Sequence, residues 1–82
     1  MSSEINERVE VVAAFGRGGV RPRTFTWARR QYLIRQVTAA WTESEGFYRQ
    51  HHFAVMTDGA NIYELCFHTR DLAWCLIRIH HD

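Results

Sequence analysis

The segment RTFTW, residues 23–27, alternates aromatic and hydroxyl side chains, and this alternation restricts the chain to a β architecture. Phe25 and Trp27 point to one side of an extended backbone, Thr24 and Thr26 point to the other, and all four residues favour strands. Further strand-forming runs cover residues 7–15, 32–37, 47–57, 61–68 and 74–80. We therefore predict an all-β fold of about six mostly antiparallel strands in a small barrel or roll.

The length of 82 residues and the apolar fraction of 46% suit one compact domain near the lower size limit for folding without disulfides or metals. We expect residues 1–82 to form this single domain, with residues 1–6 as a flexible tail. The start of the chain has no apolar stretch of signal or transmembrane length, which predicts a cytoplasmic protein without membrane contact. In that setting Cys66 and Cys75 are expected to be reduced, buried thiols.

Two segments interrupt the strand pattern. The glycines of GRGGVRPR, residues 16–23, predict a loop, with Pro22 inside it or at the first position of a strand. Near residues 38–45, apolar residues at helical spacing also fit a short helix ended by Gly46. We favour a strand that bends near Ala39–Ala40 and keep the helix as the alternative.

The hydrophobic core is predicted from one face of these strands. Its expected members are Val9, Val11, Phe25, Trp27, Ile34, Trp41, Phe53, Val55, Tyr63, Leu65, Phe67, Ile77 and Ile79.

The hairpin HHFAVMTDGANIYELCFH, residues 51–68, must place Phe53 and Val55 in the core, because burying each side chain stabilises the fold by roughly 1.5–3 kcal/mol. This requires an even register, such as a three-residue loop Thr57-Asp58-Gly59 with Gly59 left-handed. A two-residue Asp58-Gly59 turn is the alternative and would turn both apolar side chains outward.

On the next strand pair we expect Glu64 opposite Arg78, because opposite charges attract across a sheet. His51 then points toward the core edge, and His52 lies outward beside Glu64 and Arg78. The histidines and cysteines are thereby spread over two rows, which does not suit the three or four convergent ligands of zinc. We predict no metal, no cofactor and, without a recognisable catalytic motif, no enzymatic activity.

Charge is concentrated in the first half of the chain. Residues 11–42 contain six arginines and no acidic residue, and aromatic residues lie between them. Arginines neutralise phosphates and aromatic rings stack on unpaired bases, so this half predicts a module that binds nucleic acid. The candidate binding residues are Arg17, Arg21, Arg23, Arg29, Arg30 and Arg35.

The alternative function is a protein-interaction adaptor or a homodimerising domain with no nucleic-acid contact. Its candidate surface is an outer apolar face made of Met56, Ile62, Trp74 and Leu76. A homodimer through an edge strand would cover the exposed edge of so small a sheet.

Several short motifs resemble a small bacterial family of domains of unknown function. They are Pro22-x-x-Phe25-x-Trp27, then Tyr32-x-Ile34 with Val37 and Trp41, then Asp58-Gly59 before Tyr63-Glu64-Leu65, and finally Trp74-x-Leu76-x-Arg78-Ile79. The family has no assigned activity. Some members are encoded near DNA-repair polymerases, so the resemblance implies a role beside nucleic acid or a repair-complex protein. Similar sequences often carry a glycine in the turn where this chain has Arg29.

Overall fold

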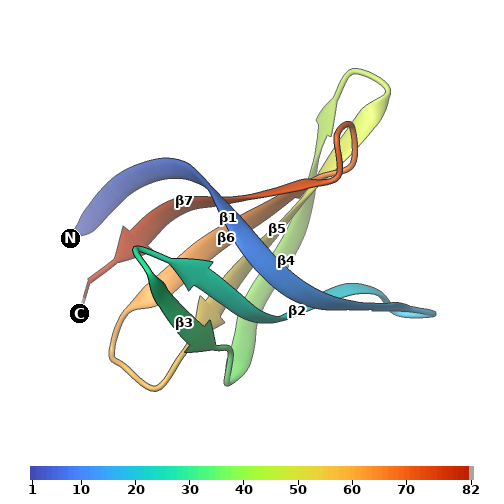
Figure 1. Cartoon of the computed structure of the whole chain (residues 1–82). Coiled ribbons are helices and arrows are strands. Elements are labelled where there is room, and N and C mark those ends of the chain that lie inside the picture. Colours follow the sequence, from blue (N-terminus) through green and yellow to red (C-terminus); the bar gives the residue numbers. More distant parts are fainter. Residues whose placement is uncertain (82) are drawn as a thin grey trace.

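A computed structural model describes residues 1–81 and contains one antiparallel sheet of seven strands, in the order β3-β2-β1-β7-β6-β5-β4 (Figure 1). The strands are β1 (Ser2–Gly16), β2 (Gly19–Trp27), β3 (Arg30–Leu33), β4 (Gln36–Glu45), β5 (Tyr48–Met56), β6 (Ile62–His68) and β7 (Ala73–His80). The all-β prediction is confirmed. The sheet curls like a roll but does not close into a barrel.

Two-residue turns join three pairs of neighbouring strands, β1–β2, β2–β3 and β4–β5. The β2–β3 turn has only two residues, Ala28 and Arg29, and both have positive φ, 52° and 64°. Gly46 opens the two-residue β4–β5 turn with φ 61°. Positive φ values in such turns match the right-handed twist of the flanking strands. The turn at Arg29 is therefore tight although the residue is not glycine.

The chain termini meet because β1 pairs with β7. Residues 2–4 of β1 lie opposite residues 78–80 of β7, and the His81 amide donates a hydrogen bond to the Met1 carbonyl (2.8 Å). Residues 2–6, expected in a tail, are therefore largely part of the sheet, although their composition is polar. Figure 1 shows both ends of the chain side by side.

Two other segments also differ from the sequence prediction. Only Arg17 and Gly18 separate β1 from β2, so Gly19–Arg23 are strand and not loop. Residues 32–37 were expected as one strand, but Ile34 and Arg35 separate β3 from β4, which makes seven strands where about six were expected. The preferred strand over residues 38–45 is confirmed. Its pairing with β5 is interrupted by a bulge between Val37 and Ala39.

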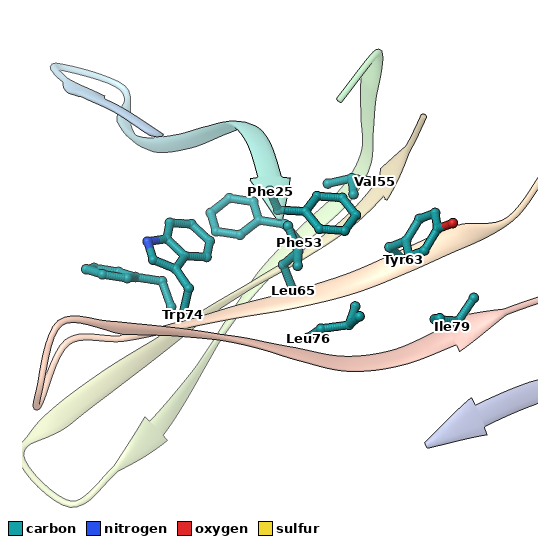
Figure 2. Close-up of a cluster of buried hydrophobic side chains, with 9 residues drawn as sticks. Phe25, Phe53, Val55, Tyr63, Leu65, Trp74, Leu76 and Ile79 are labelled. Carbon is teal, nitrogen blue, oxygen red and sulfur yellow. The ribbon is translucent and has the colours of Figure 1, made fainter. Parts of the chain in front are cut away.

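The core fills the inner face of the curled sheet (Figure 2). Its buried members are Phe25, Phe53, Val55, Tyr63, Leu65, Phe67, Trp74, Leu76 and Ile79. Of the predicted core, Val9, Val11, Trp27 and Ile34 pack against this cluster partly buried. The placement of Trp41 in the core is wrong, since its side chain is 39% exposed.

The β6–β7 register explains the largest error in the predicted core. Glu64 does pair with Arg78, as expected, but the next pair is Leu65 with Leu76. Ile77 is therefore an extra residue in a bulge, and the residues before it change face. Leu76 and Trp74 enter the core, while Ile77 lies outside the buried cluster.

The β5–β6 hairpin has the even register that Phe53 and Val55 require, and both are buried. Its loop is longer than either predicted form, because residues 57–61 lie between the strands. Gly59 is not among the residues with positive φ, so its predicted left-handed conformation is wrong.

The longer loop shifts the partners of the two histidines. His52 lies on the outer face opposite Cys66, where the prediction placed it in line with Glu64. His51 stacks at the core edge, with its ring centroid 6.4 Å from that of Phe67, as expected.

Candidate nucleic-acid interface

A cleft of about 690 Å³ opens between the β1–β2 hairpin and the strands β4 and β5. We call this hollow the cleft. One wall is formed by residues 14–16, 18–21 and 23, and the other wall by residues 37, 40–42 and 51–53. The two walls belong to strands that lie far apart in the order of the sheet and approach each other only because the sheet curls.

The cleft arises where the chain changes partners between β3 and β4. The Ile34 amide still donates to the Arg23 carbonyl of β2 (2.9 Å), whereas the next amide, that of Arg35, donates to the Met56 carbonyl of β5 (2.8 Å). Before this crossing the chain is paired with β2, and after it the chain is paired with β5. Residues 19–22 of β2 are thus left with β1 as their single strand partner among residues 1–81.

Two exposed aromatic residues belong to opposite walls of the cleft, Phe15 on the inner face of the sheet against Phe67 and Trp41 on the outer face opposite His52. Phe15 is 68% exposed, and its ring meets Phe67 edge to face at 5.8 Å between centroids. Trp41 is 39% exposed and stacks on His52 at 5.3 Å, with the two ring planes 7° apart. A second ring therefore orients each of these side chains, while much of its surface stays open to solvent.

Arg21 and Arg23 add positive charge to the same walls. Both are exposed, and within the described part of the chain no ion pair joins either of them to a carboxylate. Arg17 lies at the tip of the β1–β2 hairpin, between two glycines that line the cleft. Three of the six predicted arginines therefore gather at the cleft or at its rim.

Arg35 lies beside the cleft but is already paired. It lines a neighbouring hollow of about 300 Å³ together with Arg21 and Arg23. Its guanidinium donates to both carboxylate oxygens of Asp58, at 2.6 and 3.3 Å. This hydrogen bonding and the attraction between the charges raise the pKa of Arg35 and lower that of Asp58.

Arg29 and Arg30 lie at the opposite end of β2 from the hairpin tip, in and beside the β2–β3 turn. The Arg30 guanidinium sits 5.5 Å from the centroid of the Tyr32 ring. The structure does not bring these two arginines to the cleft, so the six predicted residues divide into two groups.

The alternative apolar surface is not assembled. Trp74 is 8% exposed and Leu76 is fully buried, because the bulge at Ile77 turns both toward the core. Met56 and Ile62 pair with each other at the end of the β5–β6 hairpin and are partly exposed. Two of the four residues are therefore unavailable to a partner.

A polar cluster surrounds His52 on the outer face, where the sequence predicted this histidine beside Glu64, and Glu43 joins the cluster from β4, which the sequence did not predict. The histidine Nε2 lies 2.6 Å from Glu43 Oε2 and 3.7 Å from Cys66 Sγ, and its Nδ1 lies 3.8 Å from Glu64 Oε2. Burial, and next the neighbouring Cys75, raise the pKa of the Cys66 thiol to about 12. The thiol is therefore neutral near pH 7, which does not suit nucleophilic catalysis.

Among residues 1–81, no group of three or more histidines, cysteines and acidic residues is arranged to hold a metal ion. The same residues include no helix of the length and hydrophobicity needed to cross a membrane.

Comparison with models of protein families matches residues 1–81 to a family described as "Domain of unknown function (DUF6504)". No curated protein and no solved structure matches the chain.

Proposed function

The chain belongs to this DUF6504 family, and because the family carries no assigned function, we propose from the geometry of the cleft that the domain binds single-stranded nucleic acid. The observation that carries the proposal is the combination of Arg21, Arg23, Phe15 and Trp41 around one hollow. Arginines that track a backbone and aromatic rings that stack on bases are the two parts of sequence-tolerant single-strand binding.

The exposed rings favour a single strand over a duplex. Stacking on Phe15 or Trp41 requires a base with a free face, and bases inside a duplex have none. Both rings are held by neighbouring rings before any ligand arrives, so little side-chain freedom is lost on binding.

The charge distribution limits the path of the strand. Glu43 and Glu45 lie on the part of β4 nearest the β4–β5 turn, whereas Arg21 and Arg23 lie on the facing β2 wall. The phosphates are therefore expected along β2 and the bases toward Trp41. Because the net charge of the chain is only +1, we expect local contacts at the cleft to carry the affinity.

The experiment is a titration of fluorescently labelled single- and double-stranded oligonucleotides, followed by anisotropy at several salt concentrations. If two phosphates are neutralised, the logarithm of the association constant should fall with the logarithm of the salt concentration with a slope of about −1.4. Arg21→Gln combined with Arg23→Gln should abolish most of this slope. The matched control removes the same charge at the far end of β2, by Arg29→Gln with Arg30→Gln, and should keep it.

The stacking contribution is tested separately. Trp41→Ala should weaken single-strand binding by about 5- to 150-fold, the equivalent of about 1–3 kcal/mol for one stacked base. The proposal would be refuted if binding did not depend on salt concentration. It would also be refuted if the Arg29/Arg30 control lost binding as fully as the Arg21/Arg23 variant. The association with DNA repair that the family resemblance suggests stays a prediction, which capture of repair proteins with and without nuclease treatment would test.

The free edge of β4 favours homodimerisation as a second candidate function. β4 has ten residues, nine of them exposed, and beyond β5 it has no strand partner among residues 1–81. Such an edge pairs readily with another strand. Sedimentation over a range of protein concentrations should then show a mass twice that of the chain, and a monomer at all concentrations would exclude this candidate.

A further inference from the structure

One continuous row of side chains crosses five strands on the outer face of the sheet. Successive cross-strand partners are Arg8 on β1, Cys75 on β7, Cys66 on β6, His52 on β5 and Trp41 on β4. We call these five residues the transverse row. Directly opposed residues in an antiparallel sheet share a face and their side chains contact each other. The row therefore joins a pair of thiols to Trp41, a residue in the wall of the cleft.

The two cysteines of this row lie directly opposite each other, as a cross-strand disulfide requires. Both are free thiols in the structure, and they are direct partners in the β6–β7 ladder. Opposed residues in an antiparallel pair have Cα atoms about 4.5–5.5 Å apart, inside the range of about 4.4–6.8 Å that disulfides span. Their Cβ atoms are typically about 4.5–5.5 Å apart and must approach to about 3.5–4.5 Å, so the bond would be strained and readily reduced.

We propose that Cys66 and Cys75 are a reversible disulfide site, oxidised by small-molecule disulfides such as oxidised glutathione, and that this oxidation controls the cleft. The control of the cleft rests on the proposed nucleic-acid binding. The formation of the disulfide does not.

Burial sets the order of the chemical steps. Cys66 is 0% exposed, whereas Cys75 is only partly buried, so an oxidant reaches Cys75 first. The Cys75 thiolate attacks one sulfur of oxidised glutathione, forms a mixed disulfide and releases one glutathione, which takes up the proton that Cys75 lost. Cys66 then attacks the Cys75 sulfur and releases the second glutathione, which receives the Cys66 proton. In total two protein thiols are oxidised and one glutathione disulfide is reduced to two thiols.

The ionisation of both thiols limits the rate of the exchange. Burial raises the pKa of the Cys66 thiol to about 12, so the second step depends on the position of Cys66 directly opposite the Cys75 mixed disulfide. Burial raises the pKa of the Cys75 thiol, and the neighbouring Arg8 lowers it in part. Because the thiolate is the attacking species, the first step should be slow at neutral pH and should accelerate as the pH rises toward and beyond 9.0, the ordinary pKa of this thiol.

Oxidation would change the support of Trp41. The Cys66 sulfur lies 3.7 Å from His52 Nε2, and the His52 ring stacks on the Trp41 ring. A bond to Cys75 draws this sulfur toward β7 and away from His52. The His52 ring then loses its contact with the Cys66 sulfur, and the Trp41 ring stacked on it is held less firmly in position. We therefore expect oligonucleotide affinity to fall several-fold.

The test is incubation of the folded protein with oxidised glutathione, followed by intact mass measurement under denaturing, thiol-blocking conditions. The expected product has lost two hydrogen atoms, carries no glutathione and returns to two blocked thiols after reduction. Cys66→Ser should stop at one glutathione adduct on Cys75, and Cys75→Ser should remain unmodified while folded. No reaction, a persistent glutathione adduct on the wild type, or a disulfide between two chains would overturn the proposed site.

Oligonucleotide binding of the oxidised and reduced proteins is then compared, with Cys75→Ser treated in the same way as the control. Weaker binding of the oxidised wild type alone supports control of the cleft, and equal binding overturns it. An internal disulfide in a protein that binds no oligonucleotide in either state would refute the proposed function and the control together while confirming the disulfide site.

Discussion

Truncation of Leu76 to alanine should destabilise the domain far more than truncation of its neighbour Ile77. Leu76 is fully buried in the core cluster, and replacing such a leucine by alanine costs about 2–5 kcal/mol. Ile77 is the bulge residue, partly exposed and outside the cluster, so Ile77→Ala should cost about 1 kcal/mol or less, mainly through lost strand propensity. We therefore expect a difference of at least about 1–2 kcal/mol between the two variants.

This difference can be measured by urea denaturation followed by tryptophan fluorescence. A domain of this length has a total stability of about 4–12 kcal/mol, so Leu76→Ala should shift the midpoint strongly and leave the m-value unchanged. If that variant does not fold, the milder pair Leu76→Val and Ile77→Val gives the same ranking. An equal cost, or a larger cost at Ile77, would mean that β7 continues regularly past Arg78 and that the bulge is absent.

Three further predictions concern turns and ionisation. Gly46→Ala should lower the free energy of unfolding by about 1 kcal/mol, because alanine is strained at φ 61°, while Gly59→Ala, at a residue without positive φ, should be neutral or slightly stabilising in the same denaturation assay. Arg29→Gly should raise the melting temperature, because it relieves a non-glycine residue at φ 64°; a lower melting temperature would contradict the tight turn. The neutral Cys66 thiol is favoured in the folded state, so its contribution to stability is present below pH 9 and is lost as the pH rises toward about 12. Wild type should therefore lose more stability over that range than Cys66→Ala, and parallel curves would show that the buried thiol ionises as freely as in the unfolded chain.

The register of the β5–β6 hairpin could be predicted because its two faces differ strongly in polarity. Phe53 and Val55 alternate with His52 and Ala54, so a slip of one residue would expose two large apolar side chains. Hydrophobic burial therefore decides whether the register is even or odd, that is, which face of the sheet each side chain occupies. It does not decide the length of the loop, since Thr57-Asp58-Gly59 and the observed residues 57–61 satisfy the same parity.

The bulge in β7 could not be predicted on the same basis. Trp74 and Leu76 form one alternating set of side chains, Cys75 and Ile77 form the other, and both sets are apolar. A pattern of period two identifies the buried face only when the other face is polar. Trp74 and Leu76 are the buried set because they pack against strands that are distant in the sequence. The local sequence pattern contains no information about that packing.

Half of the candidate interface was visible in the sequence. The basic wall follows from the cluster of arginines in residues 11–42, and Arg21 and Arg23 do line the cleft. The opposite wall depends on the partner change at Ile34 and Arg35, which brings Trp41 across from β2. Trp41 was assigned to the core because apolar aromatic residues in strands are usually buried, and no local pattern indicated that it belongs to the outer face.

The partner change at Arg35 also suggests how the charge of the interface could be increased. Asp58 holds the Arg35 guanidinium beside the hollow that Arg21 and Arg23 share, and both members of this ion pair are largely exposed. Exposed ion pairs contribute little to stability, so Asp58→Asn should leave the unfolding midpoint nearly unchanged. The freed guanidinium can then neutralise one more phosphate, and the salt slope for single-stranded oligonucleotides should steepen by about 0.7, from about −1.4 to about −2.1. An unchanged slope in a stable Asp58→Asn protein would show that the strand does not pass this end of the cleft, and the phosphates would then have to follow Arg17 and the hairpin tip instead.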